Sequence, residues 1–223
     1  MVRTARYSEE DFIEATMALV GEGGPAAATM QAIARRVGAP TGSIYHRFES
    51  RAAVLGAAWN AAYGSFTRAL APLLHEGRPR DAALAILPWS RENGHRARFL
   101  LLHEPVTLFE DTPPPAPQRL ELERLEEAFD GAFRACLAVR RGDTQGADAL
   151  CEEELARAKF LIFDAPIAIL RPHLMRGGTL PPFVERMIAE LHAGMPVAAT
   201  QARGPRPAAS HEGGPAGIPS HAA

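Results

Sequence analysis

The sequence has almost no lysine and very little cysteine. Of its 24 basic residues only Lys159 is a lysine, which we attribute to a GC-rich genome rather than to function. Two cysteines, Cys136 and Cys151, are too few for a disulfide framework, and we expect both to be reduced thiols in the core. Reduced thiols are typical of the cytoplasm, so we expect a cytoplasmic protein.

Long apolar runs are also missing from the chain. No run approaches the roughly 18 residues that a membrane span requires, and residues 1–5 lack the apolar segment of a secretory signal. No β-branched run alternates with a period of two, whereas apolar residues recur at spacings of three and four. The sequence therefore predicts an all-α protein with no membrane partner.

Enzyme motifs are absent as well. His103 and Glu104 begin an H-E-x-x-H pattern, but position 107 is threonine, which excludes that zinc site. There is no C-x-x-C, no G-x-S-x-G and no Walker loop. We predict no catalytic residue, no metal site and no cofactor.

No charge of one sign dominates the chain as a whole. The net charge of −2 excludes a chain-wide basic field for nucleic acid. Residues 1–51, however, hold six arginines and six acidic residues that lie in separate stretches. The acidic residues crowd the first helix, whereas Arg35, Arg36, Arg47 and Arg51 follow it. A neutral total can therefore conceal a local basic face.

Composition divides the chain into three parts: residues 1–51, 52–194 and 195–223. From Pro196 to Ala223, 17 of 28 residues are proline, glycine or alanine, and Val197 and Ile218 are the only large aliphatic residues. Such a segment buries too little apolar surface to offset its ordering entropy, so we expect a disordered tail. A tethered interaction arm is the alternative.

The first part predicts a helix-turn-helix. Ser8 and Asp11 resemble a capping box, which predicts a first helix over residues 9–20, stopped by the glycines that follow. Thr29 can cap a second helix, Gly38 supplies the turn, and a third helix is expected over residues 41–47. The second helix turns one apolar face inward: Met30, Ile33, Ala34 and Val37.

The outward face of the third helix is polar and short. Ile44 and Phe48 point to the core, so Gly42 and His46 point away from it, and Gly42 allows close approach to DNA. Hydroxyl and arginine side chains nearby can meet phosphates. The candidate DNA contacts are Thr29, Thr41, Gly42, Ser43, Tyr45, His46, Arg47, Ser50 and Arg51. As alternatives, Thr29 and Ser50 act only as caps, Tyr45 lies partly in the core, and Arg47 and Arg51 are solvated charges.

The stretch Thr29–Arg51, TMQAIARRVGAPTGSIYHRFESR, resembles the DNA-binding domain of the TetR/AcrR family of bacterial transcriptional regulators. Two positions depart from the usual pattern: Arg47 stands where many members have histidine, and Arg51 where many have lysine. The positions that carry the resemblance are Thr29, Ala34, Gly38, Thr41, Gly42, Ile44, Tyr45, Phe48 and Arg51.

The resemblance implies a homodimer that places one third helix in each half of a near-palindromic double-stranded DNA operator. It also implies that Gln31 can reach bases, although this residue is otherwise a solvated polar group. From this resemblance we expect a ligand-responsive repressor that a small-molecule effector releases from DNA. An activator, or a helical binding protein that has lost DNA function, are the alternatives.

Residues 52–194 predict a larger helical domain for effector binding and dimerisation. Helices are expected over residues 51–74, 81–92, 95–103, 118–140, 144–170 with a kink at Pro166, and 182–192. The candidate effector contacts, each of which can instead be core, are Trp89, Phe99, His103, Phe109, Phe129 and Phe133. These aromatic residues indicate a largely apolar ligand. By the same analogy the dimer face uses Leu155, Phe160, Ile162, Ile167, Leu170, Phe183, Met187 and Leu191.

Overall fold

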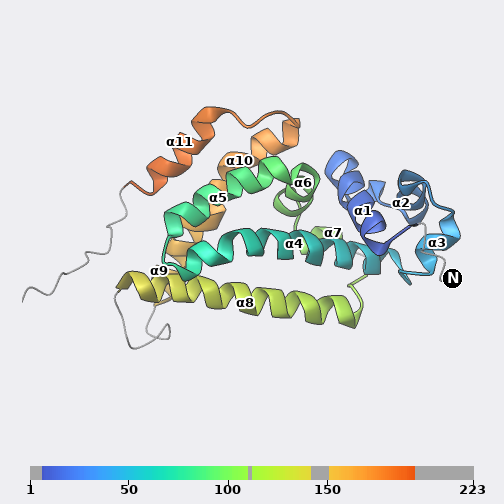
Figure 1. The fold of residues 1–223 in the computed structure, drawn as a ribbon, viewed down its shortest axis with the longest axis horizontal. Helices are drawn as coiled ribbons and strands as arrows, with labels where there is room; N and C mark the ends of the chain where they lie inside the picture. Colours follow the sequence, from blue (N-terminus) through green and yellow to red (C-terminus); the bar gives the residue numbers. More distant parts are fainter. Residues whose placement is uncertain (1–6, 110–111, 142–150, 194–223) are drawn as a thin grey trace, which may run out of the picture.

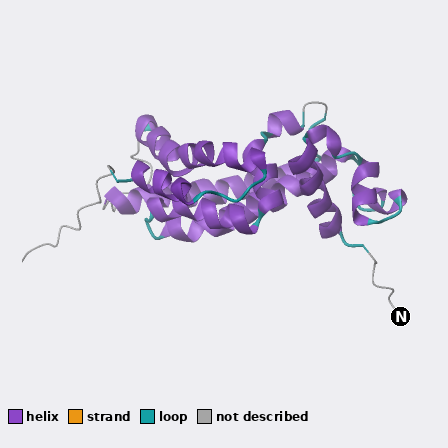
Figure 2. Cartoon of the chain, turned by 90° about the horizontal axis from the view of Figure 1, so that it is seen from above, coloured by secondary structure: helices purple, strands orange, loops and turns teal. Residues whose placement is uncertain are grey.

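The computed structural model describes residues 7–109, 112–141 and 151–193, and Figure 2 shows these segments as helices joined by loops. Across these ranges there is no strand, which confirms the predicted all-α class. Within the same ranges, no helix combines the length and the apolar character that crossing a bilayer requires. The predicted tail lies outside the described residues.

Three helices form a small head at one end of the molecule (Figure 1). They are α1 (Glu9–Gly23), α2 (Met30–Val37) and α3 (Thr41–Tyr45), with the short 3₁₀ turn η1 (Pro25–Ala27) between the first two. Ser8 and Asp11 form the predicted capping box of α1. Helix α1 runs beyond the predicted end at Val20, and it ends at one of the glycines that follow, Gly24, at φ +77°. The third helix is one turn, shorter than the predicted span 41–47.

A long helix, α4 (Arg51–His75), runs from the head through the body (Figure 1). On one side it packs against α8 (Ala116–Arg141), and on the other against α5 (Pro79–Glu92) and α6 (Gly94–Leu102). The short α7 (Pro105–Leu108) follows α6. Pro72 stays inside α4 rather than ending it.

The C-terminal helices differ most from expectation. Residues 144–150 lie outside the described part, and α9 (Glu152–Lys159) begins after Cys151. A wide π turn, η3 (Phe160–Asp164), precedes Pro166 and leads into α10 (Ala165–Arg176), and the Ala165 N–H donates to the Phe160 carbonyl. The last helix is α11 (Pro182–Leu191).

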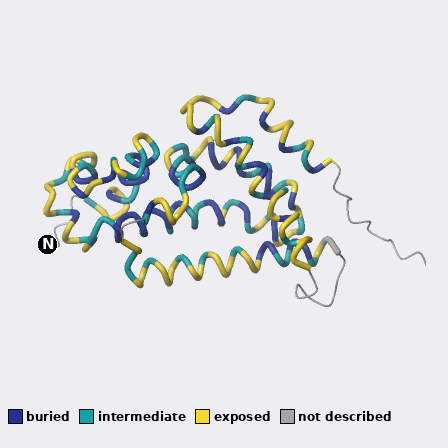
Figure 3. The backbone as a smooth tube through the Cα atoms, turned by 180° about the vertical axis from the view of Figure 1, so that it is seen from behind, coloured by how far each residue is buried: buried dark blue, intermediate teal, exposed yellow. Residues whose placement is uncertain are grey.

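One apolar core extends from the head into the body, and a smaller one lies between α8 and the far end of α4 (Figure 3). Phe12, Ile33 and Ile44 are fully buried in the head. Because this core crosses residue 51, the division into residues 1–51 and 52–194 stays a prediction. Cys136 is buried as expected, but the same prediction for Cys151 was wrong, because this thiol is exposed at the start of α9.

Candidate functional site

The helix-turn-helix is held by local backbone geometry. Gly38 ends α2 in the left-handed region, at φ +76°, which glycine adopts without strain. The Ala39 N–H then binds the Ala34 carbonyl at 2.9 Å. Ile44 and Phe48 are buried as predicted, so the orientation of α3 is fixed by the core.

The outward side of α3 is exposed. Thr41, Gly42, Tyr45 and His46 all face solvent, and Tyr45 is 56% exposed, so the alternative that it lies partly in the core was wrong. A Cβ added at Gly42 would meet no atom within 4 Å. The packing of this chain therefore does not require glycine at position 42.

Two of the predicted contact residues are also helix caps. The Thr29 hydroxyl accepts a hydrogen bond from the Ala32 N–H at 3.1 Å, and the Ser50 hydroxyl accepts one from the Ala53 N–H at 3.1 Å. Each hydroxyl keeps its own hydrogen to donate. Gln31 lies on α2 rather than on α3, and it is exposed.

Arg47 and Arg51 turn toward the protein rather than outward. Arg47 donates hydrogen bonds to the Ser43 and Tyr7 carbonyls and lies over the Phe12 ring, 5.5 Å from its centroid. Arg51 donates to the Ala28 carbonyl at 2.9 Å and to the Pro25 carbonyl at 2.6 Å. Both guanidinium groups therefore stabilise the head through hydrogen bonds to its backbone.

The sequence prediction missed Tyr7. Its hydroxyl donates to the Gly38 carbonyl at 2.8 Å, which ties the segment before α1 to the turn between α2 and α3. The signal was available, because Tyr7 and Phe12 occupy the positions of a hydrophobic staple around the Ser8 cap.

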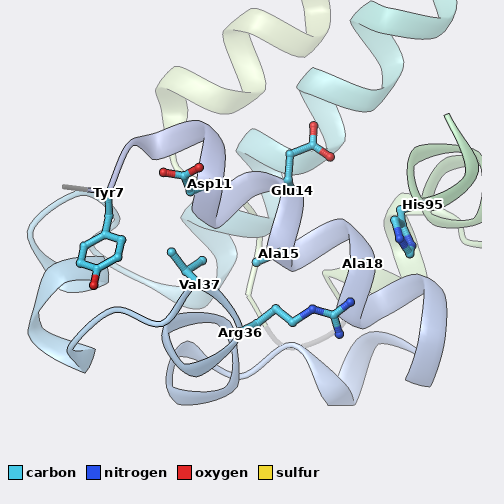
Figure 4. Close-up of a pocket in the computed structure, with 8 residues that line it drawn as sticks. All are labelled: Tyr7, Asp11, Glu14, Ala15, Ala18, Arg36, Val37 and His95. Carbon is cyan, nitrogen blue, oxygen red and sulfur yellow. The ribbon is translucent and has the colours of Figure 1, made fainter. Parts of the chain in front are cut away.

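An open groove of about 560 Å³ lies between α1, α2 and α6, with Tyr7 at one end and His95 at the other (Figure 4). Its charged side chains are already paired. Asp11 accepts from the Ser8 N–H, which lowers the pKa of this carboxyl, and Arg36 binds Glu22 through two hydrogen bonds of 2.7 and 2.8 Å. The groove therefore presents no unsatisfied charge to a ligand.

Arg96 joins the body to the head and was also missed. From α6 it forms ion pairs with Glu10 and Glu14 of α1, and its side chain is only 22% exposed. Arg96 lies 86 and 82 positions beyond these two partners in the sequence, so no local pattern could have brought them together. These ion pairs join α6 of the body to α1 of the head.

A second opening, which we name the α4–α8 cavity, lies between α4, the end of α7 and the first half of α8. Its volume is about 270 Å³. Gly56, Trp59 and Asn60 line it from α4, and Phe109 lines it from beyond α7. Gly56 is about one and a half turns from the start of α4, so this cavity borders the helix that carries the head.

The candidate effector residues separate in the structure. Phe109 lines the α4–α8 cavity, and His103 lines another opening of about 570 Å³ between α6 and α10. The remaining four line none of the cavities described in this section. Trp89, Phe99 and Phe133 are buried and Phe129 is half-buried, and they stack edge-on or tilted against other aromatic rings, as Phe66 and Trp89 do at 5.1 Å.

The electrostatics around the first half of α8 are acidic. Burial raises the pKa of Glu126, and the neighbouring Glu123 carboxylate raises it further. Burial also raises the pKa of the Tyr63 phenol to about 12, with contributions from Glu126 and Asp130. Among the described residues, no group of three or more metal-ligating side chains comes together.

Residues 12–58 match the family model of the bacterial regulatory proteins of the tetR family. This match covers α1 from Phe12 onward, the helix-turn-helix and the start of α4. A search of curated proteins found no match.

Several solved structures share the fold at low sequence identity. The fatty acid degradation regulator FadR from Bacillus halodurans has a TM-score of 0.59 at 15% identity, over 85% of this chain and 100% of the other. The TetR family transcriptional regulator PfmR from Thermus thermophilus has 0.55 at 20%, over 84% and 95%. The superantigen pfit has 0.52 at 17%, over 83% and 87%. Such likeness shows the fold of the matched part of this chain, but not its ligand.

Proposed function

We propose that this chain, whose residues 12–58 match the tetR-family model, is a DNA-binding transcriptional regulator of that family and acts as a repressor. Two copies bind a near-palindromic operator, and a small, largely apolar molecule releases them. Because its target is the chromosome, we place the protein in the cytoplasm.

The observation that carries the proposal is the exposed face of α3. Thr41, Gly42 and Tyr45 lie on it with their side chains or backbone open to solvent. Gly42 has open space on its outer side that nothing in the chain fills. This face fits the floor of a major groove, because the backbone at Gly42 has no Cβ and can approach base edges closely.

Phosphate contacts in this proposal come mainly from hydroxyls and helix N-termini. Arg47 and Arg51 already hold carbonyl groups, and Arg36 is paired with Glu22, whereas Arg35 is exposed on α2. Thr29, Tyr45 and Ser50 can donate to phosphate oxygens, and Gln31, Ser43 and His46 face or flank the same surface. The salt dependence comes from cationic side chains such as the exposed Arg35, because their contact with phosphates releases counterions, so affinity is expected to fall as salt rises.

The C-terminal helices offer a surface for a second copy. Phe160, Met175, Phe183 and Met187 are large apolar residues that are at least 43% exposed. Water contact at such a patch is unfavourable unless another surface covers it. Ile162 and Leu170 are fully buried and belong to the monomer core, whereas Leu155, Ile167 and Leu191 are half-buried at its edge.

Release by an effector requires a link from ligand to head. In the proposal a ligand enters the α4–α8 cavity and separates α8 from α4 near Gly56. The N-terminus of α4 is bound to the head through Arg51, and α6 is bound to it through Arg96, so displacement of α4 tilts α3. The ligand must bind the released conformation more tightly, or the equilibrium does not move.

The test of DNA binding is Gly42→Ala. We expect this variant to fold at least as stably as the native protein, because the new methyl group meets no atom of the chain and alanine favours helix by about 0.5–1 kcal/mol. Its affinity for the gene's own promoter region, measured by fluorescence anisotropy, should fall at least about tenfold, which corresponds to roughly 1.4 kcal/mol.

Gly131→Ala is the matched control, because Gly131 is also exposed, helical and without neighbours within 4 Å, but lies on α8. It should bind DNA as the native protein does. If neither variant changes affinity, or the native protein shows no saturable, salt-sensitive binding, a helical binding protein without DNA function becomes the better description. A reporter gene fused to the bound promoter separates repression from activation.

A further inference from the structure

We propose that the α4–α8 cavity selects a small amphiphilic cation, an apolar body that carries a protonated amine. The inference rests on the proposed function, because it specifies the chemistry of the effector that the cavity receives. The new element is the charge of the ligand, because the fold alone does not specify that charge.

The floor of the cavity is apolar. Trp59, Phe109 and Leu122 line it together with Pro105 and Pro114. Trp59 is 6% exposed, so its ring is already fixed by the core and costs little further ordering when a ligand arrives. The volume of about 270 Å³ equals roughly nine water molecules at about 30 Å³ each, which suits one ring and a short chain.

The rim of the cavity is acidic. Glu123 and Glu126 line it from α8, one turn apart, and neither forms an ion pair with any residue in the described ranges. Arg119 lines the same rim, one turn before Glu123, and it too makes no ion pair there. Two carboxylates against one guanidinium leave a net negative charge, and burial raises the pKa of Glu126, so this carboxylate lacks a stabilising partner.

A buried acceptor beside the rim also lacks a partner. The side-chain oxygen of Gln118 is buried and accepts no hydrogen bond from the part of the chain that the structure describes, although the Gln118 backbone carbonyl accepts one from the Asn60 amide at 2.8 Å. Buried oxygens of this kind are normally satisfied. Rotation of the Gln118 amide toward the cavity would offer this oxygen to an N–H donor of the ligand.

A protonated amine complements both the acidic rim and the Gln118 side-chain oxygen. It is a cation for Glu123 and Glu126, and it carries up to three N–H donors, one of which can reach Gln118. A carboxylate or phosphate would instead face two like charges and would leave the Gln118 oxygen unpaired. A neutral alcohol has one donor and no charge, so its affinity should lie between these extremes.

The experiment uses three probes with the same phenylpropyl body: 3-phenylpropylamine, 3-phenylpropan-1-ol and 3-phenylpropionate. Each is titrated calorimetrically into the full chain without DNA. We expect the amine to bind at least about tenfold more tightly than the carboxylate, because the two rim carboxylates attract the amine and repel the carboxylate. Equal or tighter binding of the carboxylate would overturn the proposal, as would failure of the amine to bind.

Glu126→Gln sharpens the result, because the amide keeps the shape and removes the charge. It should weaken the amine about tenfold and leave the alcohol within about twofold. Glu127→Gln is the matched control, since Glu127 is exposed on the same helix and does not line the cavity. If the two variants act alike, the acidic rim does not select the ligand.

This outcome is independent of DNA binding. A chain that binds the amine through Glu126 but binds no promoter would refute the proposed regulator and leave the cavity chemistry in place. A chain that binds DNA but prefers the carboxylate would do the reverse.

Discussion

The head and the body of this protein use polar groups in opposite ways. In the head, Arg47 and Arg51 turn inward onto carbonyls, and the polar face of α3 is outside. In the body, the α4–α8 cavity lies between two helices and has an unpaired Gln118 oxygen beside it. A rigid face suits a partner whose shape is fixed, such as duplex DNA. A cavity with an unsatisfied group suits a ligand that changes how two helices pack.

The largest expected effect separates core aromatics from cavity aromatics. Phe99 is fully buried against Trp59, whereas Phe109 is half-buried at the cavity. We expect Phe99→Ala to lower the free energy of unfolding by about 3–5 kcal/mol, because it leaves a void in the shared core. Phe109→Ala should cost less than about 2 kcal/mol, since part of its ring surface is already open. Urea unfolding measures both, and equal losses would mean that the cavity wall is as tightly packed as the core.

The next effect concerns the wall between α4 and α8. A Cβ at Gly56 would lie 2.9 Å from Pro114 Cβ and 3.0 Å from Gln118 Cβ, so something must shift. We expect Gly56→Ala to lower the free energy of unfolding by about 1–2 kcal/mol, because overpacking outweighs the gain in helix propensity. Gly131→Ala, with no neighbour within 4 Å, should instead raise it by about 0.5–1 kcal/mol. Thermal unfolding of the two variants tests this. If both substitutions raise the free energy of unfolding, α8 moves to accommodate a Cβ at Gly56 without cost.

The smallest effect tests whether a residue of the head has two roles. Thr29 caps α2 and is a predicted DNA contact. Thr29→Ala should lower the free energy of unfolding by about 1 kcal/mol through loss of the cap. Thr29→Asp should keep this stability within a few tenths of a kcal/mol, because aspartate is an equally good cap, but weaken promoter binding by repelling phosphate. Promoter affinity equal to that of the native protein would remove Thr29 from the interface and leave it only as a cap.

The sequence predicts the head better than the body, because the features of the head depend on residues that are close together in the sequence. The caps at Ser8, Thr29 and Ser50 and the turn at Gly38 depend on neighbours within a few residues, and the structure confirms them. Most of the body helices were also found, because their apolar periodicity is local.

What the sequence did not predict depends on distant partners. Arg51 binds carbonyls 23 and 26 positions away, and Arg47 binds one 40 positions away, so neither orientation follows from spacing. The same holds for Phe99 and Phe109, which look alike in the sequence and are separated only by how α4 packs with α6 and α8. The wide turn at Phe160–Asp164 was likewise not predicted, because it depends on how the backbone hydrogen bonds are arranged ahead of Pro166.

The pairing of Arg51 with backbone carbonyls has a consequence for sequence variation. A salt bridge between side chains has two points of failure, because a substitution at either partner removes it. A carbonyl is present in every residue, so positions 25 and 28 can change their side chains without releasing Arg51, provided that the chain keeps its path. Among the side chains involved, only that of Arg51 is therefore needed for these hydrogen bonds.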